Sequence, residues 1–221
     1  MFGPQTTIPE DLLLLCVDPV SETVRQPQTF RFALAGGVVA ELLAAETLAL
    51  DGHRLVEPPD APPPAPLSHP ALDQALATLT GAMGRTGLSL RSGLHRLSSH
   101  AATPYLASLV ERGLLRTERT KVLGLFPVTR HHPLHPGVHA ERLALLDDVL
   151  RPDPPTADPS TYARSLRLAA LASAGGLDRR LYPGPEGRGS RRRQRELCAR
   201  DPLARGVDQA ISAARSSAAG G

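Results

Sequence analysis

Basic side chains are the residues of this sequence best suited to ligand chemistry, and almost all of them are arginines. Lysine occurs once, at Lys121. Arg191, Arg192 and Arg193 form a compact positive block, and Arg195 follows closely. Guanidinium groups hold phosphate through charge-assisted hydrogen bonds, and each charge near an anionic surface contributes on the order of 1 kcal/mol. The block therefore suits a phosphate group or an anionic membrane, although a solvated helix start has the same composition.

Histidine and aspartate clusters give weaker indications of metal or enzyme chemistry. Pro133 and Pro136 interrupt the histidines at 131–139, so these do not share one helix face, and no cysteine or carboxylate is suitably spaced beside them. Asp147-Asp148 and Asp153 have the wrong spacing for the magnesium motifs of helical prenyl-diphosphate enzymes. The sequence also has no glycine-rich phosphate loop and no nucleophile elbow. We therefore expect no cofactor and no metal, and we favour a non-enzymatic protein while leaving catalysis open.

Composition favours a mainly α fold with a single compact helical domain. The 221 residues are 41% apolar but only 3% aromatic, so leucine, alanine and valine must form the core. The excess of arginine over lysine, with abundant alanine and proline, is typical of a GC-rich bacterial genome. Cys16 and Cys198 are too few for a disulfide framework, which favours a reducing compartment. No stretch has the length of a membrane span, and the Leu12–Leu15 run lacks a basic leader, so we expect a cytoplasmic protein.

Local signals divide the chain into short helices and two hairpins. Thr7 and Glu10 form a capping box that opens a first helix. Gly36-Gly37 permits close contact between helices, and Asp51-Gly52 between alternating apolar residues predicts a short hairpin over 48–56. Helical or apolar-periodic segments are predicted at 30–45, 70–83, 88–97, 138–150 and 159–175 and from Pro202 onward.

The stretch 103–132 combines a helix with a second hairpin. Thr103 is a good N-cap for the helix, with Pro104 at its first position, and Gly113 stands where a helix ends in the left-handed conformation. The predicted hairpin has strands at 114–117 and 122–126 and a charged turn at 118–121.

The apolar end of this projecting hairpin predicts an interface. Its candidate contact residues are Val122, Leu123, Leu125 and Phe126. Flanking cations at Arg119, Lys121 and Arg130 suit an anionic lipid surface, but an apolar patch does not identify its partner. The hairpin therefore either touches a membrane or packs on protein, including a second copy in a homo-oligomer.

A helix followed by a hairpin is also typical of winged-helix DNA-binding proteins. Such proteins need a recognition helix rich in basic or amide side chains. The helix before this hairpin offers only Ser108, Glu111 and Arg112, and Glu111 would repel phosphate. This composition argues against nucleic acid as a partner.

Several short strings, in their order along the chain, resemble the Golgi phosphoprotein 3 family. The strings are Glu10-Asp11 before four leucines, Gly36-Gly37 leading to Glu41-Leu42, Asp73-Gln74-Ala75-Leu76, Leu109 to Gly113, and Leu125-Phe126 leading to His132-Pro133. The resemblance covers most of residues 7–215, which we expect to form one domain, with flexible ends at 1–6 and 216–221. It implies the fold of mainly helical peripheral membrane proteins that recognise phosphatidylinositol 4-phosphate.

The headgroup residues of that family are replaced in this chain. The family holds the phosphate with a tryptophan and three basic residues, which by ungapped counting fall on Gln26, Ala35, Ser99 and Ala102. Alanine cannot supply the contacts of arginine. Basic residues close by in the sequence are Arg25, Arg31, Arg96 and His100.

Three functions follow from these observations, and the sequence favours the first. The first is a peripheral membrane protein that binds an anionic phospholipid or phosphoinositide headgroup through Arg25, Arg31, Arg96, His100 and the block 191–193. The second is a small-molecule-binding or enzymatic protein of a bacterial secondary-metabolite pathway that reuses the family pocket. The third is a winged-helix-like DNA-binding regulator.

Overall fold

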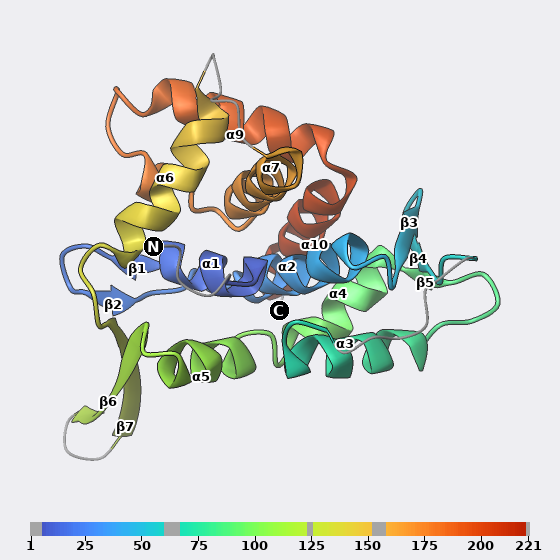
Figure 1. Cartoon of the computed structure of the whole chain (residues 1–221), viewed down its shortest axis with the longest axis horizontal. Coiled ribbons are helices and arrows are strands. Elements are labelled where there is room, and N and C mark those ends of the chain that lie inside the picture. The colour runs from blue at the N-terminus through green and yellow to red at the C-terminus, as the bar shows by residue number, and fades with distance from the viewer. Residues whose placement is uncertain (1–5, 60–66, 123–125, 152–157, 220–221) are drawn as a thin grey trace.

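The helices form three layers around a buried central pair (Figure 1). The computed structural model describes residues 6–59, 67–122, 126–151 and 158–219. The middle layer contains α1 (Ile8–Leu15) and α2 (Arg31–Ala44). One outer layer contains α6 (Val138–Leu150), α7 (Pro159–Ala174) and α9 (Arg188–Arg200), with the short α8 (Asp178–Leu181) packed on α9. The other contains α3 (Pro70–Thr80), α4 (Leu90–Ser98) and α5 (Thr103–Glu111). The last helix, α10 (Pro202–Ala219), crosses the layers and contacts α2, α4, α7 and α9.

All eight residues of α1 are buried, including Glu10 and Asp11 in its first turn. The predicted capping box is present, and the Thr7 N–H donates to Glu10 Oε2 at 2.7 Å. A helix that is buried on every side can contact neighbours all round, and α1 touches α2, α5, α6 and α7. The buried acidic pair therefore lies where several helices meet.

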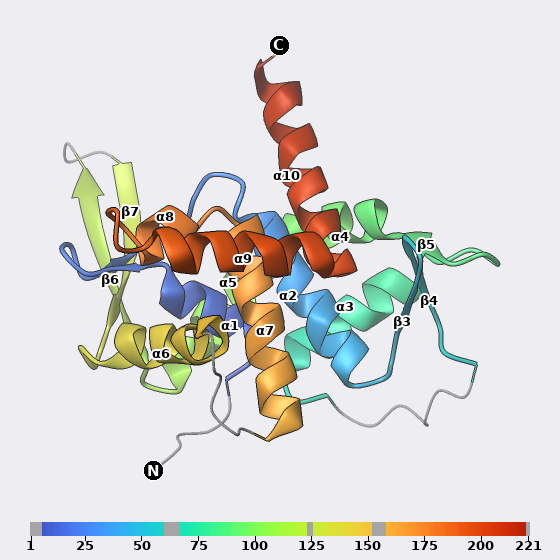
Figure 2. The same cartoon turned by 90° about the horizontal axis from the view of Figure 1, so that it is seen from above.

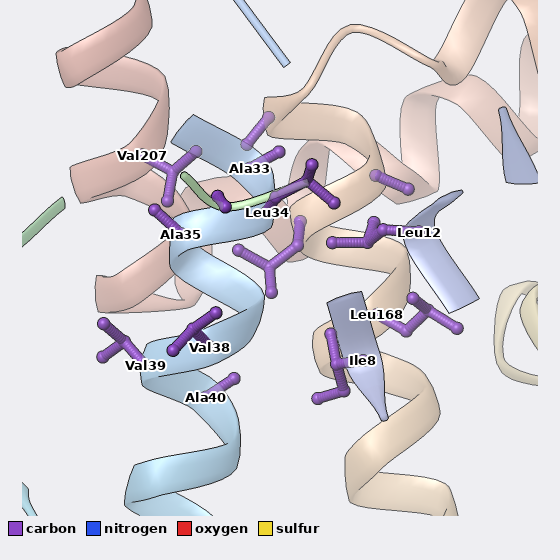
Figure 3. Packing of buried hydrophobic residues seen from close by; sticks show 14 of the residues in the cluster. Ile8, Leu12, Ala33, Leu34, Ala35, Val38, Val39, Ala40, Leu168 and Val207 are labelled. Carbon is purple, nitrogen blue, oxygen red and sulfur yellow. The ribbon is translucent and has the colours of Figure 1, made fainter. Parts of the chain in front are cut away.

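The contact between α2 and α10 depends on a small residue. A Cβ added at Gly36 would lie 2.5 Å from Val207 Cγ2 and 2.9 Å from Leu171 Cδ2, so a larger residue does not fit. Figure 3 shows Ala35 on the side of α2 that faces Val207, within the apolar core. The predicted close contact of helices at this position is confirmed.

Short strands lie between the helices. β3 (Ala49–Asp51) and β4 (Arg54–Val56) form the predicted short hairpin, and Gly52 adopts φ +55° at its turn. Two further antiparallel pairings are not predicted by the sequence: β4 with β5 (Leu88–Ser89), and β1 (Val17–Asp18) with β2 (Thr23–Val24).

The second hairpin projects from the body and is longer than predicted (Figures 1 and 2). β6 (Leu115–Val122) pairs with β7 (Phe126–Pro133), in a register that runs from Leu115 opposite Pro133 to Val122 opposite Phe126. The predicted turn at 118–121 is therefore wrong, because these residues lie inside β6. Strand residues of a hairpin that projects into solvent can carry charge, so a charged run does not mark a turn there. Leu123 and Leu125 lie outside the described residues, as do the side chains of Val122 and Phe126.

The N-cap of α5 differs from the prediction by one residue. α5 begins at Thr103 itself, so Ala102 and not Thr103 occupies the N-cap position. A single-residue shift is the scale on which helix limits are hardest to predict. α3 begins at Pro70 as predicted, and its cap is the side chain of His69, whose Nδ1 accepts from the Ala71 N–H at 3.0 Å.

The described ends of the chain are structured. Thr6 is buried and its hydroxyl donates to Asp11, and α10 continues to Ala219, past Ser216 where the sequence suggests fraying. In the described part of the chain, no helix is both long and apolar enough to cross a membrane. The mainly α fold class with a projecting hairpin and a second short hairpin is confirmed.

Candidate functional site

The basic residues predicted to bind a headgroup lie on three different surfaces. Arg31 and Arg96 line one groove between α2, α4 and α10. Arg25 lines another groove beside β2 and β7, and the block 191–193 lies on α9. Arg31 and Arg96 therefore share a groove, whereas Arg25 and the block 191–193 lie elsewhere. His100 is exposed just past the end of α4 and is not among the residues that line the groove.

The α2–α4–α10 groove has a volume of about 660 Å³ and is lined by three arginines and a histidine. Its lining residues are Arg31 and Phe32 on α2, Arg91, Ser92, His95 and Arg96 on α4, and Ala210, Ala213, Ala214 and Ser217 on α10. The α10 residues that line it all have small side chains. No carboxylate is among the lining residues, so the groove carries positive charge without a built-in counter-charge.

The cations of this groove are free to bind a ligand. Arg31, Arg91 and Arg96 make no side-chain hydrogen bond or ion pair with the described residues. The Arg31 guanidinium lies 5.2 Å from the ring centre of Phe32, and the His95 ring stacks on Phe32 at 6.3 Å. Phe32 is buried, so it holds these two side chains from below. An anion entering the groove would meet three guanidinium groups and an imidazole.

Arg91 and His95 are the groove residues that sequence reasoning missed. α4 exposes the pair Arg91 and Ser92, then His95 and Arg96 one turn later, and then Ser99 at the next turn. A spacing of three to four residues places side chains on one helix face. The helical period of these polar residues was the signal that could have found them.

The four positions that the resemblance implies do not form a headgroup site. Ala35 is fully buried and faces α10, and Gln26 lines the groove beside β7 (Figure 3). Arg31 stands one helical turn before Ala35, and Arg96 stands three residues before the exposed Ser99. Basic residues are therefore present on α2 and α4, but each lies about one turn closer to the N-terminal end of its helix than the position that the resemblance implies.

Part of the arginine block on α9 has structural partners. Arg191 donates to the carbonyls of Tyr182 and Gly184, which ties the start of α9 to the loop before it. Arg195 Nη2 lies 2.6 Å from Asp178 Oδ2, whereas Arg192 makes only an exposed pair with Glu196 at 3.6 Å. Arg193 is exposed. These partners offset the unfavourable position of positive charge at a helix start.

A buried charge cluster joins α1 to four other helices. It contains the carboxylates of Glu10, Asp11 and Glu41 and the guanidinium groups of Arg112, Arg142 and Arg164. Arg112 Nη1 lies 2.9 Å from Glu10 Oε2, and Arg142 Nε lies 3.0 Å from Asp11 Oδ1. Breaking a buried pair is strongly destabilising, so the cluster fixes how the helices meet.

The same cluster sets the charge state of Glu10. Burial by itself would raise the pKa of Glu10, but hydrogen bonds from the Thr7 N–H and the Ser108 hydroxyl and the charge of Arg112 outweigh it. The pKa of Glu10 is therefore lower than its ordinary value. Ser108 donates to Glu10 Oε1 at 2.7 Å, so this face of α5 is directed inward.

The comparison with protein families decides the identity of this fold. A model of Golgi phosphoprotein 3 (GPP34) matches residues 8–214. The chain belongs to the Golgi phosphoprotein 3 family. The match runs from α1 into α10, so it includes the α2–α4–α10 groove and the projecting hairpin. A comparison with curated protein sequences returns no match.

The strings that carry the likeness to the Golgi phosphoprotein 3 family supply much of the buried charge cluster. Glu10 and Asp11 come from the first string, Glu41 from the second and Arg112 from the string that ends at Gly113. The likeness therefore resides in residues that hold the helices together. This explains how the family fold is kept while the implied headgroup positions have changed.

The histidines near β7 do not gather around a common point. His132 Nε2 lies 2.9 Å from Glu118 Oε2, whereas His139 Nδ1 lies 3.3 Å from the Leu14 carbonyl oxygen. Within the described ranges, no group of three or more histidine, cysteine or acidic side chains is arranged to hold a metal ion.

Proposed function

We propose that this member of the Golgi phosphoprotein 3 family is a non-enzymatic peripheral membrane protein that binds anionic phospholipid headgroups in the α2–α4–α10 groove. The observation that carries the proposal is the set of cations in this groove, which has no carboxylate among its lining residues. A phosphate group would supply the missing negative charge through charge-assisted hydrogen bonds. Family membership supports the same class of ligand.

The arrangement of the molecule supports contact with a flat surface. In Figure 2, the last turns of α10 and the far ends of β6 and β7 project toward the same side of the molecule. The groove is lined by α10 residues from Ala210 onward, so it lies beside the part of α10 that projects to that side. A headgroup can therefore enter the groove while the hairpin approaches the same membrane. The hairpin residues Val122, Leu123, Leu125 and Phe126 would touch lipid or a second copy of the chain.

The alternatives receive less support from the geometry. Arg91, His95 and Arg96 are exposed, so the site is an open groove and not the deep apolar cavity that a small-molecule or enzymatic function would favour. Ser108 on α5 and Arg112 at its C-cap bind Glu10, so two of the three polar side chains that a recognition helix would use contact the interior. We therefore propose no nucleic-acid partner.

Vesicle sedimentation tests the proposal. The full chain is mixed with phosphatidylcholine vesicles, or with the same vesicles containing phosphatidylinositol 4-phosphate or phosphatidylserine. We expect sedimentation only with the anionic vesicles, falling as salt rises, and an Arg31→Glu, Arg96→Glu variant should bind about tenfold more weakly or worse. The matched control is Arg192→Glu, Arg193→Glu on α9, which changes the net charge equally. Sedimentation that ignores lipid charge, or equal loss in the α9 variant, would overturn the proposal.

The role of the hairpin needs a separate measurement. A Leu125→Asp, Phe126→Asp variant should lose vesicle binding if the hairpin touches lipid. The same variant should instead lose a dimer or larger species in light scattering if the hairpin joins two copies. If neither property changes, the hairpin has no part in the proposed function.

A further inference from the structure

A second groove lies at the base of the projecting hairpin, where β7 packs beside β2. This β2–β7 groove has a volume of about 460 Å³. Its polar lining consists of Ser21, Thr23, Arg25, Gln26, Thr129, Arg130, His131 and His132, and Val24 and Leu106 complete it. It shares no lining residue with the α2–α4–α10 groove.

The β2–β7 groove carries two guanidinium groups that no described carboxylate neutralises. Arg130 has no side-chain partner among the described residues, and the guanidinium of Arg25 donates only to Thr23 Oγ1, at 3.3 Å. The lining includes no carboxylate. Burial and the nearby His132 lower the pKa of His131, so at neutral pH its imidazole is an uncharged donor or acceptor beside the two arginines.

Two acidic residues of the neighbouring strands are already engaged, whereas Glu22, between the lining residues Ser21 and Thr23, is exposed to solvent. Glu118 on β6 lies 2.9 Å from His132 Nε2 and 3.9 Å from Arg116 Nη1. Asp18 on β1 accepts from the Ser21 N–H at 2.8 Å and lies 3.7 Å from Arg180 Nη2. Their negative charge is therefore balanced locally, and the arginines of the groove keep their positive potential.

One wall of the groove is fixed before any ligand arrives. The Arg25 N–H donates to the Cys16 carbonyl at 2.8 Å, and the Arg25 carbonyl accepts from Arg180 Nη1 at 2.5 Å. Thr23, which accepts from Arg25, is itself only 7% exposed. Because its backbone is held on both sides, binding of an anion by Arg25 would require ordering of the side chain alone. The other wall is β7, whose position is set by its ladder with β6.

We propose that the β2–β7 groove is a second anion site, which takes a phosphate group held between Arg25 and Arg130. The hydroxyl group of Thr129 and the imidazole of His131 are the additional donors. Two guanidinium groups with neutral donors are the chemistry that recognises a phosphate monoester, whether on a lipid headgroup or on a soluble molecule. Because Arg25 belongs to the body and Arg130 to the hairpin, a bound phosphate joins the two parts. Occupancy of this site therefore restrains the hairpin relative to the body.

The test observes the two arginines directly in the folded full chain. Inorganic phosphate is titrated at neutral pH while the side-chain Nε–H signals of Arg25 and Arg130 are followed by NMR. We expect both signals to shift together and to saturate, with a single affinity. If neither signal shifts, or if each shifts without saturating, the proposal is wrong.

Variants separate this site from the α2–α4–α10 groove. An Arg31→Gln, Arg96→Gln variant should retain the saturable shifts of Arg25 and Arg130. An Arg25→Gln variant should abolish the shift at Arg130, because one arginine alone holds the anion poorly, and thermal unfolding checks that this variant is folded. Retention of the Arg130 shift in Arg25→Gln would contradict a shared site. Neither outcome depends on vesicle binding, so failure here leaves the proposed function untouched.

Competition identifies the source of the phosphate. Phosphatidylcholine vesicles that contain phosphatidic acid are added to the phosphate-bound protein. Reversal of the Arg25 and Arg130 shifts supports a lipid phosphate as the ligand. Shifts that persist support a soluble phosphate as the ligand of the same site.

Discussion

Arg164 and Asp11 are 153 positions apart in the chain, yet Arg164 Nη1 on α7 lies 2.7 Å from Asp11 Oδ2 on α1. Arg142 on α6 holds the other carboxylate oxygen of Asp11 at 3.0 Å. Arg164 also donates to the Thr6 carbonyl and lies 3.5 Å from Glu41 Oε1 on α2. One buried carboxylate thus links α1 to two helices of an outer layer, and its arginine partner reaches a fourth helix.

Removal of Arg164 should destabilise the fold strongly. Arg164→Met leaves Asp11 buried with only part of its compensating charge, and such losses cost about 3–5 kcal/mol of unfolding free energy. Urea denaturation measures the change. Arg192→Met is the matched control, because Arg192 is 82% exposed in its pair with Glu196 and such pairs contribute about 1 kcal/mol or less. Equal urea midpoints for the two variants would show that the cluster does not hold the helices together.

Glu10 should make stability depend on acid pH. The pKa of Glu10 is lower in the folded protein than its ordinary value of 4.5. Its contribution is therefore present above pH 4.5 and is lost as the pH falls from there through the folded pKa. Urea unfolding at a series of pH values should show stability falling in this range for the wild type. Glu10→Gln should be less stable at neutral pH and flatter in acid, and an unchanged acid slope would contradict this assignment.

Replacement of Gly36 by a larger residue should destabilise the protein, because α10 packs directly against this position. Gly36→Ala places a methyl group 2.5 Å from Val207 Cγ2, and overpacking of this kind costs about 1–3 kcal/mol. Val207→Ala removes the closest atom, so the double variant should be more stable than the sum of the two single changes implies. Rescue is partial, because Leu171 Cδ2 remains 2.9 Å away. Strictly additive unfolding free energies would mean that the two residues do not meet.

Two substitutions to arginine compare an exposed position, Ser99, with a buried one, Ala35. Ser99→Arg adds a charge to the exposed face of α4, at a helix end that favours cations, so the protein should stay folded and bind anionic vesicles a few-fold more tightly. Ala35→Arg places a charge in the fully buried contact with α10, and it should reduce stability severely. Thermal unfolding and vesicle sedimentation measure both. A stable Ala35→Arg protein with increased vesicle binding would show that this position faces the ligand site.

The sequence by itself determined the elements that depend on near neighbours. The Thr7–Glu10 capping box and the turn at Gly52 were both predicted from residues a few positions apart. These features could be predicted because a cap or a turn is formed by hydrogen bonds and backbone angles within one short segment. The same reasoning placed the turn of the projecting hairpin wrongly, because a solvent-exposed strand tolerates the charges that usually mark a loop.

Only the tertiary structure decided which arginines could bind a ligand. In sequence, Arg25, Arg31 and Arg96 were equivalent candidates, but the packing of α2 on α4 brought Arg31 and Arg96 together and left Arg25 beside β7. Arg191 and Arg195 became structural because the loop and α8 supplied their acceptors. An arginine is free to bind an anion only if the folded chain places no acceptor within its reach. That depends on residues far away in sequence, so composition and spacing could not reveal it.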